Sequence, residues 1–177
     1  MPAPYLESPR LYYKALSLEN CTEEYVNWLN DEEVILYLET GGNYTIEKLR
    51  EFLNKIQNNP SILFWAIYLK ENNKHIGNIK IDPVSLRHKR GEYGIMLGDK
   101  NEWGKGFARE ATETILDYCF TVKNLHKITL GVVEDNKGAV ELYKRIGFVT
   151  EGRLMAHGVY GGKFCNVLRM AIFNSKW

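Results

Sequence analysis

The stretch from Leu97 to Arg109 combines three glycines, several charges and a change of hydrophobic period. Before it, residues 93–97 have strand character. After it, apolar residues recur at spacings of three and four, which is typical of one face of a helix. At such a helix start, backbone N–H groups lack helical partners and the helix dipole adds positive potential. The stretch is therefore suited to bind a phosphate or a pyrophosphate.

The glycine loop itself, residues 103–108, differs from two common phosphate-binding motifs. It contains neither the G-x-x-x-x-G-K-S/T of nucleotide P-loops nor a G-x-G-x-x-G followed by an acidic residue on a second strand. It resembles the acetyl-CoA pyrophosphate loop of the GNAT acetyltransferase superfamily, whose pattern is Gln/Arg-x-x-Gly-x-Gly/Ala. Gly106 and Ala108 match this pattern, and Trp103 stands where Gln or Arg is usual. The variant W-G-K-G-x-A is familiar in the branch that contains the ribosomal-protein N-terminal acetyltransferases.

A second segment, from Asn136 to Phe148, resembles another cofactor segment of the family, N-x-x-A-x-x-L-Y-x-x-x-G-F. The two segments occur in the expected order with a β-rich run between them. The resemblance covers residues 9–174 and is most specific over the cofactor-binding core, at about 92–148. It implies a sheet in which two neighbouring strands splay apart and the cofactor lies in the gap.

Acetyl-CoA is the co-substrate that the resemblance implies. The loop backbone is expected at the pyrophosphate, with Lys105 and Arg109 adding positive charge or lying as solvated surface residues. The strand before the loop is expected at the thioester and pantetheine arm, and Asn136 at the pantetheine while it also caps a helix. The implied cofactor-binding residues are Met96, Leu97, Gly98, Trp103, Gly104, Lys105, Gly106, Phe107, Ala108, Arg109, Asn136 and Tyr143.

Acetyl transfer to an amine needs a neutral amine and benefits from a proton on the departing thiolate. Tyr143 occupies the general-acid position of the family, and an ordinary Tyr pKa near ~10 keeps it protonated at pH 7. Glu92 occupies the place at which related enzymes use an acidic residue to deprotonate the amine through water. The alternatives are a buried structural Tyr and an exposed strand Glu. No metal ion is indicated.

The acceptor pocket is expected between the first helices and the last hairpin. Residues 25–39 resemble the start of GNAT enzymes that acetylate amino sugars. Aromatic side chains there could stack on a sugar or a nucleotide base, or could belong to the core. The candidate acceptor-binding residues are Trp28, Tyr37, Glu39, Thr40, His157 and Tyr160.

Hydrophobic patterning and turn residues predict a single α/β domain over residues 1–177, with a central mixed sheet flanked by helices. Pro83 is expected to end a strand, and Gly94 to mark a bulge or a packing position. Strands are predicted at 9–15, 64–69, 74–81, 89–97, 127–133, 148–156 and 164–173. Helices are predicted at 23–29, 32–38, 45–58, 108–122 and 136–147.

Bulk properties are those of an ordinary globular protein of 177 residues, with 45% hydrophobic and 25% charged residues. The net charge of +1 gives no general attraction to nucleic acid. The three cysteines are widely spaced and indicate neither a zinc site nor a disulfide framework. Without a signal pattern or a long apolar run, the chain is expected to be cytoplasmic and not membrane-bound; a homodimer is left open.

The sequence thus predicts an acetyl-CoA-dependent N-acetyltransferase whose acceptor is a primary amine of a small molecule, such as a nucleotide-linked amino sugar. One alternative keeps the chemistry but makes the acceptor a protein N-terminus. Another is a non-catalytic acyl-CoA-binding sensor, which the presence of both Tyr143 and Glu92 disfavours.

Overall fold

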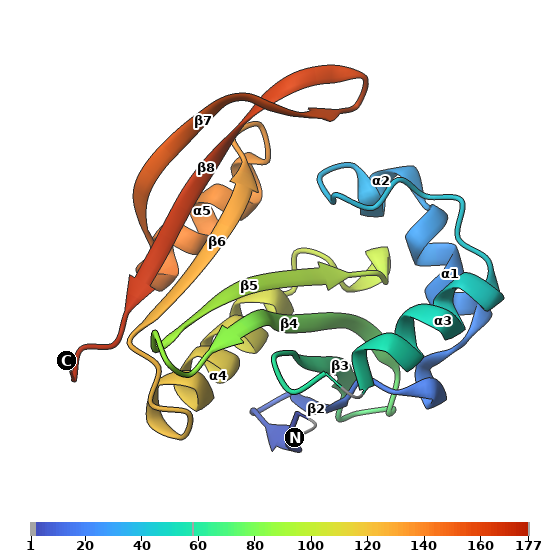
Figure 1. Cartoon of the computed structure of the whole chain (residues 1–177). Coiled ribbons are helices and arrows are strands. Elements are labelled where there is room, and N and C mark those ends of the chain that lie inside the picture. The colour runs from blue at the N-terminus through green and yellow to red at the C-terminus, as the bar shows by residue number, and fades with distance from the viewer. Residues whose placement is uncertain (1–2, 58, 177) are drawn as a thin grey trace.

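Eight strands form one mixed sheet in the computed structural model, which describes residues 3–57 and 59–176 (Figure 1). The spatial order is β1-β2-β3-β4-β5-β6-β8-β7, antiparallel except for the parallel pair β5 and β6. The strands are β1 (Leu6–Glu7), β2 (Leu11–Ala15), β3 (Leu63–Leu69), β4 (His75–Ser85), β5 (Arg90–Leu97), β6 (Lys127–Val133), β7 (Val149–Tyr160) and β8 (Lys163–Phe173).

Helices cover both faces of this sheet, as the predicted α/β class requires. One core packs the sheet against α4 and α5, and a second core packs α1 to α3 against the opposite face. On α3, Leu49, Leu53 and Ile56 are buried, as their spacing predicts. The helices are α1 (Glu23–Asn30), α2 (Glu32–Ile35), α3 (Ile46–Gln57), α4 (Phe107–Thr121) and α5 (Lys137–Ile146), with 3-10 turns η1 (Leu18–Asn20) and η2 (Lys100–Glu102).

The sheet splays between β5 and β6. These strands pair only through Arg90, Gly91 and Glu92, opposite residues 127–129. Beyond Glu92 the strands separate, and the gap between them is visible in Figure 1. The α4 helix follows β5 through η2 and the glycine loop. The splayed sheet implied by the family resemblance is therefore present, and it places the loop at the end of the strand that lines the gap.

Several predicted boundaries were wrong. The β4 strand continues past Pro83 to Ser85, because the pairing with β5 shifts register between Ile81 and Val84 and so accommodates the proline. Gly94 marks no bulge, since it pairs regularly with Lys80. The α2 helix ends at Ile35 rather than near residue 38, and the last two strands extend to a short turn at residues 161–162.

Other boundaries agree with the predictions. Thr45 caps α3, with its hydroxyl accepting a hydrogen bond from the Lys48 backbone N at 3.3 Å. The predicted end of this helix at Asn58 lies outside the described residues.

Within the described part of the chain, no helix is long and apolar enough to cross a membrane.

Candidate active site

The glycine loop leads directly into the first turn of α4. Gly104 and Gly106 have φ values of 75° and 84°, in the left-handed region that favours glycine. Gly106 is the N-cap of α4 and provides no side chain to its first amides. The first backbone bond of the helix runs from Glu110 N to Gly106 O at 3.1 Å. The amides of the first turn are therefore placed to bind an anion, reinforced by the helix dipole.

Trp103 connects the glycine loop to the end of β5 through a hydrogen bond. Its indole Nε1 donates a hydrogen bond to the Leu97 carbonyl oxygen at 2.9 Å, while the ring stays partly exposed. The resemblance placed Trp103 where the family has Gln or Arg, without assigning the indole a contact. In this protein the Trp103 indole hydrogen-bonds to the backbone at the end of β5.

Arg10 contacts the glycine loop, which the sequence analysis did not predict. Its Nη1 donates to Lys105 O at 2.9 Å, and its Nε forms an ion pair of 2.7 Å with Oε2 of Glu110. Its guanidinium also lies 4.4 Å from the ring centroid of Phe107. These contacts join the N-terminal strand to a loop that is about 95 residues away in the sequence, so no local pattern could have revealed them.

Lys105 and Arg109 are each paired with a carboxylate. Lys105 lies 2.9 Å from Glu102, and Arg109 lies 2.8 Å from Glu113. Both cationic side chains are exposed. The positive potential near the loop is therefore partly balanced, and a role of these two side chains in phosphate binding stays a prediction.

Along β5, backbone N–H and C=O groups alternately face β4 and the gap. Gly98 N donates to Ile76 O at 3.0 Å, so Gly98 and, by the two-residue alternation, Met96 turn their backbone groups toward β4. Ile95 and Leu97 turn theirs away from β4, where pairing with β6 has already stopped. The backbone groups that face the gap are therefore those of Ile95 and the N–H of Leu97, since Leu97 O accepts the hydrogen bond from Trp103. The predicted cofactor contacts of Met96 and Gly98 stay a prediction.

Tyr143 lies buried on α5 against Tyr93, with their rings 5.8 Å apart in an edge-to-face arrangement. Burial raises the pKa of Tyr143 to about 12, and a hydrogen bond with Tyr93 acts in the opposite direction. The Tyr93 hydroxyl lies 2.7 Å from that of Thr112, which donates to Ala108 O at 2.6 Å. A chain of hydroxyls thus links the proposed acid to the first turn of α4.

Asn136 is the N-cap of α5, as its position predicts. Its Oδ1 accepts a hydrogen bond from Ala139 N at 3.2 Å, which leaves the amide NH₂ as a donor. Its predicted contact with pantetheine stays a prediction.

Glu92 is tied into the sheet. Its Oε2 accepts hydrogen bonds from Arg169 Nη2, at 2.7 Å, and from the Thr129 hydroxyl. Alternation places Glu92 on the same face of β5 as Gly94 and Met96, as predicted. Sequence analysis did not anticipate Arg169, whose pKa is raised above its usual value mainly by the hydrogen bond to Glu92.

The predicted acceptor residues divide into two groups. Tyr37 and Tyr160 pack with the buried Cys165 and its apolar neighbours, so the loop after α2 meets the C-terminal hairpin. Glu39 is exposed and acts electrostatically on Tyr160 and Arg169, and the buried Thr40 hydroxyl has no hydrogen-bond partner among the described residues.

Trp28 and His157 differ from the other four. Trp28 is buried in the second core, 4.9 Å from the ring of His75. A Cβ on Gly98 would overlap its ring, so Trp28 packs beneath the end of β5, which is the core alternative that the sequence left open. An acceptor contact of Trp28 stays a prediction. His157 is exposed on β7.

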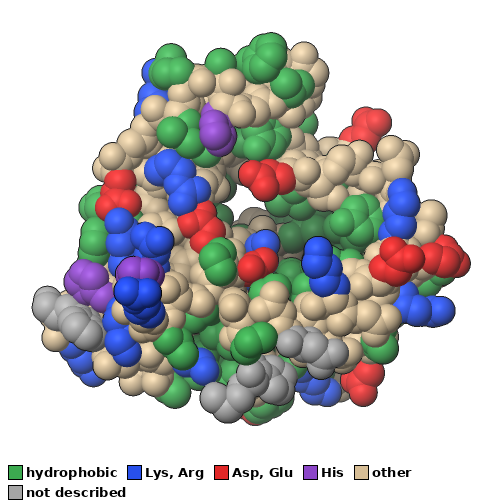
Figure 2. Space-filling view, in the orientation of Figure 1, with side chains coloured by type: hydrophobic (Ala, Val, Ile, Leu, Met, Phe, Trp, Pro, Cys, Tyr) green, Lys and Arg blue, Asp and Glu red, His purple; other side chains and the backbone are tan. Residues whose placement is uncertain are grey.

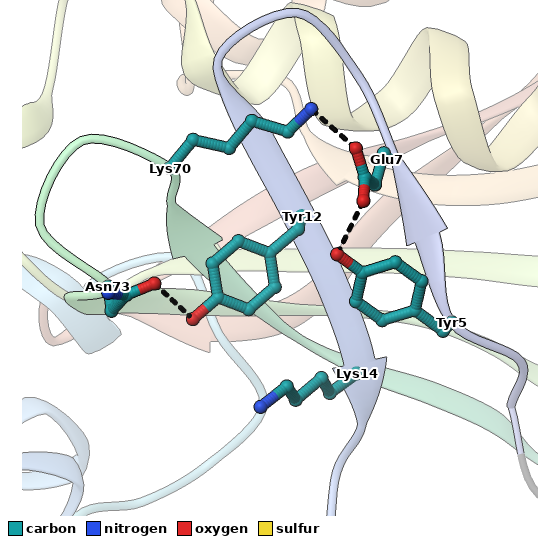
Figure 3. Close-up of a pocket in the computed structure, with 6 residues that line it drawn as sticks. All are labelled: Tyr5, Glu7, Tyr12, Lys14, Lys70 and Asn73. Atoms are coloured by element: carbon teal, nitrogen blue, oxygen red, sulfur yellow. Dashed lines mark hydrogen bonds and ion pairs between the residues drawn. The ribbon is translucent and has the colours of Figure 1, made fainter.

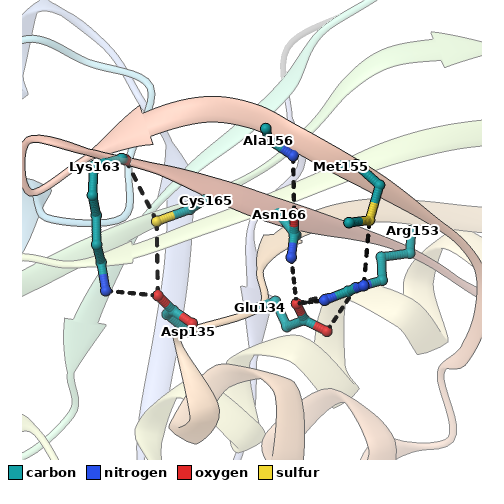
Figure 4. Close-up of polar contacts among 8 residues, drawn as sticks. All are labelled: Glu134, Asp135, Arg153, Met155, Ala156, Lys163, Cys165 and Asn166. Atoms are coloured by element: carbon teal, nitrogen blue, oxygen red, sulfur yellow. Dashed lines mark hydrogen bonds and ion pairs between the residues drawn. The ribbon is translucent and has the colours of Figure 1, made fainter.

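Polar contacts connect the turn-side half of the C-terminal hairpin to the start of α5 (Figure 4). Asp135, just before α5, forms an ion pair of 2.9 Å with Lys163. Glu134 forms one of 2.6 Å with Arg153 and accepts a hydrogen bond from Asn166. The hairpin is therefore held against the segment that leads into the helix carrying Tyr143.

The face seen in Figure 2 is hollowed between the C-terminal hairpin and the lobe formed by α1 to α3. Both acidic and basic side chains lie around this hollow (Figure 2). Among the described residues, no group of three or more His, Cys, Asp and Glu side chains could hold a metal ion.

A separate open cavity of about 480 Å³ lies on the N-terminal strands (Figure 3). Its polar groups are largely paired with one another: Glu7 contacts Lys70 at 2.7 Å and Tyr5 at 2.6 Å, and Tyr12 donates to Asn73 at 3.2 Å. It contains none of the residues considered for acetyl transfer. We therefore place the active site at the gap between β5 and β6.

A mixed sheet that splays beside a central strand, followed by an uncapped glycine loop at the end of that strand, defines a CoA-binding acyltransferase architecture. The family profile described as "Acetyltransferase (GNAT) domain" matches residues 10–149. The chain belongs to this family and is an acetyl-CoA-dependent N-acetyltransferase. The residues present fit the co-substrate, because the first turn of α4 carries no capping side chain and a Cβ on Gly104 would meet nothing within 4 Å.

Two similar proteins are spermidine acetyltransferases. The chain is 34% identical over 152 residues to spermidine N(1)-acetyltransferase of Vibrio cholerae, covering 85% of this chain and 86% of the relative. It is 35% identical over 101 residues to the Escherichia coli K12 enzyme of the same name, covering 57% and 54%. These relatives do not support the ribosomal-protein or amino-sugar branch that the motifs favoured. Cofactor-binding motifs are shared among the branches of the family, so they do not indicate which amine is acetylated.

Solved structures agree with this relationship. Spermidine N-acetyltransferase from Vibrio cholerae in complex with CoA and spermine has a TM-score of 0.88 at 30% identity, covering 96% of this chain and 98% of that one. A GNAT acetyltransferase from Bacillus anthracis has a TM-score of 0.83 at 22% identity and supports the fold alone.

Proposed function

We propose that this enzyme transfers the acetyl group of acetyl-CoA to a primary amine of a linear polyamine such as spermidine. The proposal draws on the named relatives and on one observation in this chain, the charge of the segment that borders the hollow. Polyamines carry several positive charges, so a surface that selects them should be acidic and poor in cations.

Residues 15–47 carry eight acidic side chains and no Lys or Arg, although the whole chain has a net charge of +1. This segment includes α1, α2 and the loop that meets the C-terminal hairpin. In the described part of the chain, Glu32 and Glu39 form no ion pair within 4.0 Å. The eight acidic residues are Glu19, Glu23, Glu24, Asp31, Glu32, Glu33, Glu39 and Glu47.

Acetyl-CoA, when bound, supplies a thioester that an amine nitrogen can attack. The backbone of Ile95 and the N–H of Leu97 offer polar groups along the gap, suited to orient the pantetheine arm and to hydrogen-bond the thioester oxygen. Glu92 offers a carboxylate at the closed end of the gap, suited to accept a proton from the amine directly or through water. Tyr143 retains its proton near neutral pH and can donate it to a leaving thiolate.

The amino-sugar acceptor is the weaker candidate, because its support was confined to residues 25–39 and the ring of Trp28 is buried. A protein N-terminus would require an acceptor surface that tolerates a peptide, and no feature of the described residues favours it over a polyamine.

Acetyl-CoA turnover, measured as released thiol, tests the proposal. Spermidine, spermine, a UDP-linked amino sugar and an N-terminal peptide should be compared at equal concentrations. Spermidine and spermine are expected to be turned over faster than the sugar or the peptide, and the KM for spermidine should rise with ionic strength as the acidic segment is screened. Faster turnover of the sugar or the peptide would contradict the polyamine proposal.

A charge variant provides a second, independent measurement. Replacing Glu32 and Glu39 by Gln is expected to raise the KM for spermidine about two- to fivefold, because exposed charges contribute modestly. The KM for acetyl-CoA should stay unchanged. Glu71→Gln, in the exposed turn between β3 and β4, is the matched control. Equal effects of the two changes would show that the acidic segment does not select the acceptor.

A further inference from the structure

Arg169 spans three strands of the sheet. It lies on β8 opposite Gly131 of β6, and its Nη2 reaches Glu92 on β5 at 2.7 Å. Because β6 lies between β8 and β5, the side chain must cross β6 to make this contact. A Cβ on Gly131 would lie 3.0 Å from Nη1 of Arg169. Glycine thus leaves the space through which the guanidinium passes.

The position of this contact coincides with the closed end of the gap. Glu92 is the last β5 residue paired with β6, where it lies opposite Thr129. The Thr129 hydroxyl donates to Oε2 of Glu92, the same oxygen that Arg169 contacts. Among the described residues, no hydrogen bond to Oε1 is formed. Two donors therefore fix one oxygen of the carboxylate and leave the other able to accept a proton or a hydrogen bond.

An ordinary surface ion pair would not need this arrangement. Exposed pairs between long side chains hold no fixed geometry and contribute little. Here both side chains are only about one-third exposed, at 37% for Arg169 and 31% for Glu92. Gly131 interrupts the strand sequence Lys-Ile-Thr-Leu-Gly-Val-Val, in which a β-branched residue would be the usual choice. The glycine is explained by the guanidinium above it.

We propose that Arg169 is a positioning residue for acetyl transfer, which crosses β6 over Gly131 and fixes the Glu92 carboxylate where β5 and β6 separate. The inference rests on the proposed role of Glu92 toward the amine. Glu39 and Glu151 also act electrostatically on Arg169, but Glu92 is its direct partner.

Steady-state kinetics with spermidine and acetyl-CoA test this role in the full-length enzyme. Arg169→Gln is expected to lower kcat about 10- to 100-fold, the scale on which misplacing a catalytic group acts, with the KM for acetyl-CoA nearly unchanged. Arg169→Lys should restore part of kcat, because it retains a cation at the same place. Gly131→Val should resemble Arg169→Gln, since its side chain displaces the guanidinium.

Arg153→Gln is the matched control, because Arg153 lies on the same hairpin and forms a comparable ion pair with Glu134. It should leave kcat within about twofold of the unmodified enzyme, as most surface changes do. In a Glu92→Gln background, Arg169→Gln should cause no further loss of kcat, because the two residues act through one carboxylate.

The outcomes separate this inference from the proposed function. If the unmodified enzyme turns over no polyamine, the proposed function fails; the same variants are then compared with whichever amine is acetylated, and if none is, the positioning role fails too. If spermidine is acetylated but Arg169→Gln retains full kcat, the positioning role alone is refuted. Equal losses for Arg169→Gln and Arg153→Gln, or a full additional loss in the Glu92→Gln background, would also refute it.

Discussion

The indole Nε1 of Trp103 donates a hydrogen bond to the backbone carbonyl oxygen of Leu97 at 2.9 Å. This bond joins the start of the glycine loop to the strand that lines the gap. The family pattern has Gln or Arg at this position, and the indole instead fixes the distance between the strand end and the helix start.

Trp103→Phe keeps an aromatic ring but removes the donor. One hydrogen bond contributes about 0.5–1.5 kcal/mol, so acetyl-CoA should bind roughly 2- to 10-fold more weakly. Isothermal titration calorimetry with acetyl-CoA measures this change, and thermal unfolding checks that the variant remains folded. Tighter binding by the Phe variant would mean that the indole blocks a carbonyl that the co-substrate needs.

Gly106→Val should abolish acetyl-CoA binding in a folded protein. At φ 84° a side chain costs about 1–2 kcal/mol of backbone strain, and a β-branched residue would also project into the space where an anion approaches the loop. Gly162→Val is the control, because Gly162 has φ 76° in the turn of the last hairpin and a Cβ there meets nothing within 4 Å. Both variants carry similar strain, so only Gly106→Val should lose affinity. Normal affinity in folded Gly106→Val would remove this loop from the co-substrate site.

Local patterns predicted the elements around the loop because their causes are local. The start of α4 after the glycine loop, the cap at Asn136 and the apolar face of α3 each depend on residues only a few positions apart. Pro83 shows the limit of such reasoning. A proline usually ends a strand, but a register shift against β5 lets β4 continue, and that shift depends on the partner strand.

Contacts between distant segments could not be predicted in this way. Arg10 meets Lys105 and Glu110 only after the N-terminal strand joins the sheet, and Arg169 meets Glu92 only after β8 pairs with β6. In the sequence, the contact between Arg169 and Glu92 is marked only by Gly131, a glycine within a strand rich in β-branched residues. The acceptor class was missed for the same reason, since cofactor motifs carry no information about the residues across the gap.

Tyr143→Phe should lower turnover about 10²- to 10⁴-fold while leaving acetyl-CoA affinity nearly unchanged, because it removes only the proton donor. With its pKa raised to about 12 by burial, Tyr143 should stay protonated throughout the neutral range. Tyr118→Phe is the matched control, since Tyr118 is similarly buried and packs on Trp65 at 5.8 Å. Unchanged turnover in Tyr143→Phe would exclude it as the acid, and an equal loss in both variants would indicate a packing effect.

His75 should make the free energy of unfolding depend on pH at and below pH 6.5. Its ring lies between Tyr68, 5.1 Å away, and Trp28, and its Nε2 contacts Gly77 O and Asn78 Oδ1 at 3.0 Å. Burial lowers its pKa from the ordinary value of 6.5. The unfolded chain therefore binds the proton more readily, so this contribution to stability is complete above pH 6.5 and is lost as the pH falls toward the lower, folded-state pKa.

The free energy of unfolding, measured by urea denaturation from pH 7.5 to 5, should fall with decreasing pH by at most about 1.4 kcal/mol per pH unit for this one group. In His75→Gln, which cannot titrate, the fall over this range should be reduced, whereas His88→Gln at the surface should keep it. Asp99 and Glu110 add little to this dependence, because their partners lower the pKa of each carboxyl from its ordinary value. An unfolding free energy that stays constant from pH 7.5 to 5, or the same fall in His75→Gln, would show that the buried ring does not couple folding to protonation.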